Sequence, residues 1–168
     1  MHRERNDALK EKNKIALQRY QFAVKCLGKG KEIVDIGCGL GYGSHMLRKA
    51  GNNVVGFDKS EEAIAYANKH YPGVYTIMDV EEQKIYGFDI GVCLECLCHL
   101  KNPKKFIDSL EVKELVISAP IDPNPNDGYI FRLHNLSEKQ FKRLLNGWKI
   151  INELRQKKYL TLYLKKNE

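Results

Sequence analysis

A glycine-rich stretch after a short apolar run is the feature that most constrains the fold of this chain. In EIVDIGCGLGYGS, residues 32–44, a glycine stands at every second position from 37 to 43. Glycine has no Cβ, so the backbone N–H groups of such a turn can approach a polar ligand closely, and the N-terminus of a following helix favours the same ligand. The stretch therefore predicts a buried strand, a ligand-binding turn and a helix, in that order.

Segments with strand and helix character alternate along the rest of the chain. We expect strands over residues 32–36, 53–58, 74–80, 88–95, 114–120, 148–154 and 159–165. We expect helices over residues 16–27, 43–51, 61–71, 102–110 and 138–147, three of them with N-terminal caps at Ser60, Asn102 and Ser137. This alternation predicts an α/β fold: a single Rossmann-like, doubly wound, mostly parallel seven-stranded sheet with helices on both faces.

The size and composition of the chain suit one domain. With 168 residues and 43% hydrophobic residues it can bury a core, and we assign residues 1–14 to a basic N-terminal segment that need not be ordered and 15–168 to the domain. Neither a bilayer-spanning stretch nor a signal-like opening is present, so no membrane partner is expected. The odd number of cysteines suits a reducing compartment and predicts a cytoplasmic protein.

The formal charge of +7 suits an anionic partner. Much of the positive charge lies in residues 1–14, 27–32 and 155–168. The N-terminal run has no interleaved aromatic residues, which a groove for single-stranded nucleic acid would require. We therefore favour a solvated basic surface, with nucleic acid or an anionic substrate as the less favoured alternative.

Three ligand classes use a glycine turn of this kind. A phosphate loop requires Lys-Ser or Lys-Thr after its last glycine, but Ser44 and His45 follow Gly43. The dinucleotide pattern G-x-G-x-x-G would require its third glycine at Tyr42 or at Ser44. A phosphate loop is therefore excluded. The pattern argues against an NAD-dependent dehydrogenase but leaves that interpretation open.

The remaining pattern has Asp35 closing the strand before Gly37, Gly39 and Gly41. The stretch VDIGCGLG resembles the first motif of the class I S-adenosylmethionine-dependent methyltransferases, in particular their small-molecule methyltransferase domains. The resemblance continues through FDIGVCLECLCHLKNP and runs from about Arg19 to the C-terminus. It implies S-adenosylmethionine (SAM) as the cofactor, S-adenosylhomocysteine as its product, and an enzyme that methylates an oxygen or nitrogen of a small-molecule acceptor.

The resemblance also implies which residues hold SAM. The methionine end would lie over the glycine turn near Arg19 and Tyr20, and Asp79 would accept from the adenine amino group. Asp58 closes the second strand, where a carboxylate can accept from both ribose hydroxyls in a methyltransferase or a dehydrogenase alike. The full set of expected cofactor-binding residues is Arg19, Tyr20, Asp35, Gly37, Cys38, Gly39, Gly41, Asp58, Lys59, Asp79, Val80 and Leu94.

Asp35 has two interpretations in this set. A carboxylate buried beside the turn needs partners, which are either glycine N–H groups or the ammonium group of the ligand. We favour the ligand.

Three residues are candidates for catalysis: His134, His99 and Glu95. An acceptor hydroxyl would need a base, and imidazole titrates at about 6.5 without heavy perturbation, whereas an amine acceptor would need only desolvation. Each histidine also has a structural alternative, because His99 could start the turn before Asn102 and His134 could bond a loop carbonyl.

A metal site is the less favoured interpretation of Cys93, Cys96, Cys98 and His99. Alternate residues on a strand face opposite ways, and ligands within one short segment give poor tetrahedral geometry, so we expect cysteines that pack in the core or line a cleft, and no metal. The segment between the fifth strand and its helix is compact, which leaves little room for a substrate lid. A non-catalytic SAM-binding domain, acting as a sensor or partner subunit, is therefore the alternative function.

Overall fold

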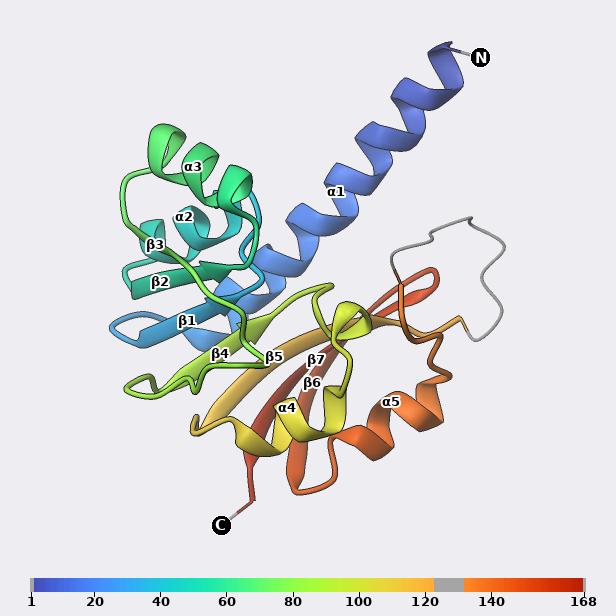
Figure 1. Ribbon diagram of the computed structural model, residues 1–168. Coiled ribbons are helices and arrows are strands. Elements are labelled where there is room, and N and C mark those ends of the chain that lie inside the picture. The colour runs from blue at the N-terminus through green and yellow to red at the C-terminus, as the bar shows by residue number, and fades with distance from the viewer. Residues whose placement is uncertain (1, 123–131, 168) are drawn as a thin grey trace.

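The sheet of this protein has seven strands, seen in a computed structural model that describes the backbone of residues 2–122 and 132–167 and the side chains of residues 14–122 and 132–167. The strand order is β3-β2-β1-β4-β5-β7-β6 (Figure 1). Strands β1 to β5 run parallel, and β7 lies antiparallel between β5 and β6. The strands are β1 Glu32–Ile36, β2 Asn53–Asp58, β3 Val74–Ile77, β4 Ile90–Cys93, β5 Glu114–Pro120, β6 Trp148–Gln156 and β7 Tyr159–Lys166. The predicted mostly parallel α/β sheet is confirmed.

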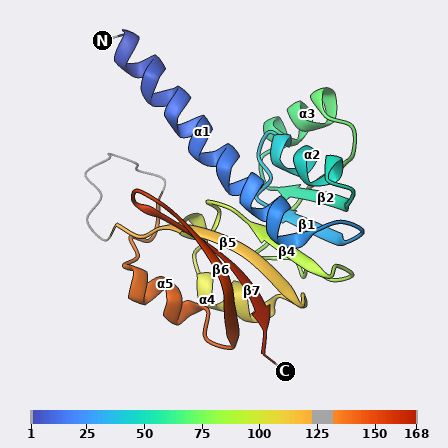
Figure 2. The ribbon, with the colours of Figure 1, turned by 180° about the vertical axis from the view of Figure 1, so that it is seen from behind.

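Helices cover both faces of the sheet, with α1, α2 and α3 on one side and α4 and α5 on the other (Figures 1 and 2). Their bounds are α1 His2–Leu27, α2 Tyr42–Lys49, α3 Glu61–His70, the 3-10 helix η1 Leu97–His99, α4 Pro103–Ser109 and α5 Glu138–Leu144. In the described part of the chain, none of these helices has the length and apolar character needed to cross a membrane.

The predicted helix caps are confirmed. The side chains of Ser60 and Asn102 accept from the backbone N–H groups of Ala63 and Lys105, and Ser137 forms a capping box with Gln140. Helix α1 differs from the expectation, because it begins at His2 rather than near residue 16, and its first turns extend away from the sheet (Figure 1).

Two strands end earlier than the sequence pattern indicates. We expected strands over 74–80 and 88–95, but β3 ends at Ile77 and β4 at Cys93. After β3 the chain turns, and the N–H groups of Glu82 and Gln83 both donate to the carbonyl of Asp79. After β4, Glu95 has a φ of 60°, which is outside the extended region. Because β3 and β4 end early, the residues that follow them are available to line a pocket at this edge of the sheet.

Each face of the sheet has its own large core cluster. In β1, Ile33 packs with the α1 and α2 side, whereas Val34 and Ile36 pack with the α4 and α5 side. Residues of a strand alternate between faces, so Asp35 shares the side of Ile33 and lies fully buried beneath α1 and α2.

Candidate functional site

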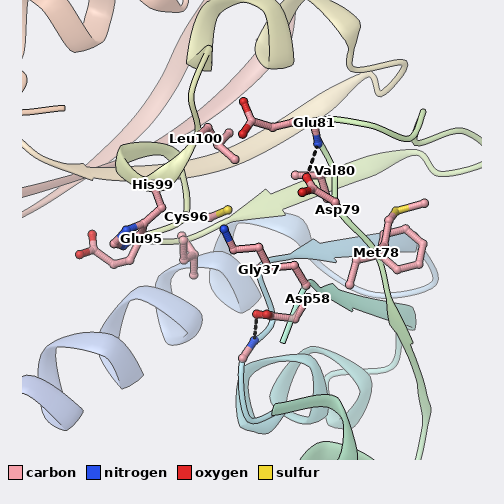
Figure 3. A pocket seen from close by; sticks show the side chains of 14 residues that line it. Gly37, Asp58, Met78, Asp79, Val80, Glu81, Glu95, Cys96, His99 and Leu100 are labelled. Atoms are coloured by element: carbon pink, nitrogen blue, oxygen red, sulfur yellow. Dashed lines mark hydrogen bonds between the residues drawn. The ribbon is translucent and has the colours of Figure 1, made fainter. Parts of the chain in front are cut away.

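A pocket of about 460 Å³ opens at the carboxyl ends of β1, β2 and β4 (Figure 3). Strand β1 lies between β2 and β4, so the strand order reverses here, and open α/β sheets bind ligands at such a switch point. The volume is in the range of small-molecule sites. The lining residues are Gly37, Gly39, Phe57, Asp58, Lys59, Met78, Asp79, Val80, Glu81, Leu94, Glu95, Cys96, His99 and Leu100.

The glycine turn forms the floor of this pocket and uses several of its own N–H groups. The N–H groups of Gly37 and Cys38 both donate to the carbonyl of Phe57, at 2.8 and 2.9 Å. The turn is thus tied to β2, and these two amides are not directed at a ligand. At Gly39, with φ of 52°, an added Cβ would meet no atom within 4 Å, so the space above this residue is open.

Asp58 stands at the end of β2 with its carboxylate at the pocket. Its Oδ2 accepts from the N–H of Gly39 and its Oδ1 from the N–H of Ser60, both at 2.9 Å. A carboxylate oxygen can accept two hydrogen bonds. One acceptor position therefore remains on each oxygen, which suits a vicinal diol such as that of a ribose.

A mainly apolar wall and a second carboxylate lie beside Asp58. Asp79 follows β3, and its Oδ1 accepts from the N–H of Glu81 at 3.0 Å. The apolar side chains that line the same pocket belong to Phe57, Met78, Val80, Leu94 and Leu100. Such a wall beside a hydrogen-bond acceptor suits a planar base that carries an amino group.

Asp35 lies beneath the pocket and does not line it. Its carboxylate is fully buried and accepts from the hydroxyl groups of Tyr20, at 3.1 and 3.2 Å, and Ser44, at 2.6 Å. Burial raises the pKa of Asp35 from 3.8 to about 6, against the opposing effect of these two hydrogen bonds. Neither sequence interpretation named these two hydroxyls, which join α1 and α2 to β1.

Arg19 reaches the pocket through Glu95. The two side chains form an ion pair at 2.9 Å, and the Arg19 guanidinium lies 4.6 Å from the centroid of the Tyr159 ring. Ser118 Oγ accepts from the N–H of Glu95 and donates to its carboxylate at 3.2 Å. Burial raises the pKa of Glu95 while Arg19 opposes the rise. These contacts hold Glu95, despite its positive φ, at the glycine-turn end of the pocket.

The two candidate histidines are placed differently. His99 lies in η1 and lines the pocket together with Glu95 (Figure 3). His134 is half-buried, and its Nε2 is 2.8 Å from the carbonyl oxygen of Leu100, outside the lining. The structural alternative for His134 is thus realised, and a catalytic role for it stays a prediction.

The pocket gathers most, but not all, of the residues expected to hold a cofactor. Those in the lining are Gly37, Gly39, Asp58, Lys59, Asp79, Val80 and Leu94. Those outside it are Arg19, Tyr20, Asp35, Cys38 and Gly41. Cys38 is buried, and Gly41 is the N-terminal cap of α2.

Sequence reasoning missed Phe57, Met78, Glu81 and Leu100 in the lining. Phe57 and Met78 directly precede the two expected carboxylates, so their places at strand ends were a usable signal. Glu81 and Leu100 lie in irregular backbone, for which the sequence offered none.

Cys93, at the end of β4, and the two cysteines after it divide as expected between core and cleft. Cys93 and Cys98 are buried, whereas Cys96 lines the pocket. Within the described ranges, no three His, Cys, Asp or Glu side chains are grouped to hold a metal ion. The expected compactness of the segment after β5 depends on residues 123–131, which lie outside the described residues.

Comparisons with known proteins connect this geometry to one family. Residues 34–111 match a family model described as "Methyltransferase domain". The ubiquinone biosynthesis O-methyltransferase of Ralstonia nicotianae is 34% identical over 86 residues, which are 46% of this chain and 36% of the relative. The mitochondrial protein of that name from Schizosaccharomyces pombe is 34% identical over 94 residues, 50% of this chain and 34% of the relative. The chain thus spans about a third of the length of these curated relatives.

Solved structures share the fold over most of the chain. Magnesium protoporphyrin IX methyltransferase from Synechocystis, solved with bound SAM, has a TM-score of 0.69 and 20% identity, over 89% of this chain and 79% of that one. An S-adenosylmethionine-dependent methyltransferase from Mesorhizobium loti has a TM-score of 0.69 and 17% identity, over 88% and 98%. The resemblance derived from the glycine turn and the following motifs is confirmed.

Proposed function

We propose that this chain, which has the fold and the domain sequence of the class I S-adenosylmethionine-dependent methyltransferases, transfers a methyl group from SAM to an oxygen of a small molecule. The observation that carries the proposal is the match of residues 34–111 to the methyltransferase-domain model, because these residues include the pocket lining and with it Asp58, whose carboxylate keeps an acceptor position on each oxygen. The names of the curated relatives, both O-methyltransferases, support an oxygen acceptor.

The lining residues fit SAM in three parts. Asp58 would hold the ribose hydroxyls, and Asp79 with the apolar wall would hold the adenine. The methionine group would lie over the glycine turn, where an added Cβ on Gly39 would meet no atom within 4 Å and where Glu95 also lines the pocket. SAM supplies a sulfonium-activated methyl group, so the protein needs mainly to align the acceptor, and orientation can lower a barrier by roughly 7 to 11 kcal/mol.

Glu95 and His99 would have different roles in the methyl transfer. Glu95 is engaged by Arg19 and Ser118, which suits a residue that orients and balances charge. His99 borders the same space, and imidazole accepts a proton near neutral pH. We therefore assign His99 as the base that takes the proton of the acceptor hydroxyl. The five free cysteines support a cytoplasmic location as part of this proposal.

Binding is the first test. Calorimetry with S-adenosylhomocysteine and, separately, with NAD should show binding of S-adenosylhomocysteine alone. Asp58→Asn should weaken that binding about 10- to 100-fold, because a hydrogen bond to a charged group contributes about 1.5–3 kcal/mol. The matched control is Asp89→Asn, because Asp89 lies directly before β4, half exposed and outside the lining. Binding of NAD alone would replace the proposal with a dehydrogenase.

Turnover is the second test. The protein is incubated with SAM and a panel of phenols and catechols, and formation of S-adenosylhomocysteine is followed. We expect turnover with at least one hydroxyl acceptor and a lower kcat for His99→Asn. Tight binding of S-adenosylhomocysteine with no turnover across the panel would instead support a non-catalytic SAM-binding domain.

A further inference from the structure

Glu81 joins two segments that both border the pocket. Its Oε2 accepts from the backbone N–H of Lys101 and its Oε1 from the backbone N–H of Asn102, each at 3.0 Å. Glu81 lies in the loop after β3, whereas residues 101 and 102 follow η1, and Figure 3 shows Glu81 beside Leu100 at the pocket. A single half-buried carboxylate therefore receives two consecutive amides from a distant part of the chain.

The loop end of this contact is tied to the expected adenine site. The N–H of Glu81 donates to Asp79 Oδ1, and the N–H groups of the two following residues donate to the Asp79 carbonyl. The loop thus closes on Asp79, and the position of the Glu81 carboxylate depends on how Asp79 is held.

The other end supports the segment that carries His99. Asn102 caps α4 by accepting from the N–H of Lys105 at 3.0 Å, and the carbonyl of Leu100 contacts His134 Nε2. Between β4 and α4 the only regular element is η1, three residues long. A short irregular segment of this kind depends on such contacts for its position.

We propose that Glu81 is a positioning residue that couples occupation of the adenine site to the placement of His99 and Leu100. The proposal rests on the proposed function for the identity of the ligand. A ligand that fixes Asp79 restricts Glu81, and Glu81 then restricts the amides of Lys101 and Asn102. By thermodynamic linkage, a substitution that frees those two amides must also lower the affinity for the ligand.

The test compares Glu81→Ala and Glu81→Gln with Glu82→Gln. Glu82 is the adjacent, exposed glutamate and is the matched control. Because the two N–H groups go to different oxygens, glutamine can accept from one of them and presents its NH₂ group to the other. In the ligand-free protein, we expect the amides of Lys101 and Asn102 to exchange with solvent about tenfold faster in both Glu81 variants, and at the wild-type rate in Glu82→Gln.

Ligand binding then separates coupling from simple structural support. In the wild type, S-adenosylhomocysteine should slow exchange at Lys101 and Asn102, and in Glu81→Ala this protection should disappear while the dissociation constant rises about 5- to 20-fold. If the amides of Lys101 and Asn102 exchange at the wild-type rate in Glu81→Ala, the Glu81 carboxylate does not protect them and the proposal is wrong. Faster exchange with unchanged affinity and protection would overturn the coupling. If the wild type does not bind S-adenosylhomocysteine, the proposed function is wrong, and the coupling, which rests on it, is wrong as well. Faster exchange in the Glu81 variants of the free protein would then show only that the contact supports the structure.

Discussion

Asp35 is a carboxylate that the fold itself buries. Because the residue faces α1 and α2 from the middle of β1, it has no access to solvent, and its partners are the hydroxyl groups of Tyr20 and Ser44. Two neutral donors compensate only part of the cost of burying a charge. The raised pKa, about 6, expresses this balance.

This pKa predicts how stability changes with pH. The folded protein retains the Asp35 proton up to about pH 6, whereas the unfolded chain loses it near 3.8. The contribution of Asp35 to the free energy of unfolding is therefore greatest below pH 3.8, falls as the pH rises through 6, and is constant above that. Asp35→Asn removes the effect, so the stability of the variant relative to wild type should increase by up to about 3 kcal/mol between pH 4 and pH 7.5.

Urea unfolding of both proteins at pH 4, 5, 6 and 7.5 measures this difference. Its absolute value at any one pH also contains the altered hydrogen bonds to Tyr20 and Ser44, so the trend with pH is the quantity that tests the idea. The control Asp89→Asn, at a half-exposed carboxylate, should show no such trend. A difference for Asp35→Asn that stays constant or decreases toward pH 7.5 would mean that Asp35 is charged at little cost.

At the residue scale, part of the pocket lining could be predicted from the sequence. Asp58 was expected at the pocket because it closes a parallel strand at the edge where ligands bind, whereas Asp79 was expected there only from the family resemblance. The partners of Asp35 and Glu95 were not identified, because the Tyr20 and Arg19 contacts depend on how α1 crosses the sheet. The Glu81 contact depends on two irregular segments and has no sequence signal.

At the scale of elements, the packing of α1 on α2 requires a glycine at position 43. A Cβ built on Gly43 would lie 1.9 Å from Cζ of Tyr20. Alanine is the better helix former by about 1 kcal/mol, yet Gly43→Ala should lower the free energy of unfolding by roughly 1–3 kcal/mol, because the ring cannot move without separating the helices. Urea unfolding measures this change.

A double-mutant cycle isolates the cause. In a Tyr20→Ala background the clash is absent, so Gly43→Ala should be neutral or stabilising. In a Tyr20→Phe background the ring remains, so the same substitution should still destabilise. If Gly43→Ala lowers the free energy of unfolding equally in all three backgrounds, the destabilisation arises within α2 and not from a clash with Tyr20.

Sequence predicted most elements but not how all of them meet. Caps and apolar spacing identified α3, α4 and α5, because a capping side chain acts within its own turn. The early ends of β3 and β4 were missed because turn geometry overrides a β-type composition there. The position of β7 between β5 and β6 could not be predicted either. The alternation of apolar and polar residues predicts which face of a strand is buried, but not which strands lie beside it.

At the scale of the whole molecule, β7 makes the C-terminal hairpin part of the common core. Leu160, Leu162 and Leu164 are fully buried, in one cluster with Val34 and Ile36 of β1. The hairpin therefore cannot leave the sheet without exposing the interior under α4 and α5. Unfolding should accordingly be one cooperative event that includes both edges of the sheet.

Trp148, the one tryptophan, provides the probe for this expectation. It lies at the start of β6 and packs against the same cluster. Its fluorescence should change at the same guanidinium concentration at which the amide signals of β1 and β2 lose their native shifts. Leu162→Ala should lower the free energy of unfolding by about 2–5 kcal/mol and move both transitions together, whereas Ile151→Ala, at a side chain 44% exposed, should cost about 0.5 kcal/mol or less. A fluorescence transition that precedes the amide transition would show that the hairpin opens first, and the chain would then be two cooperative units joined through β5.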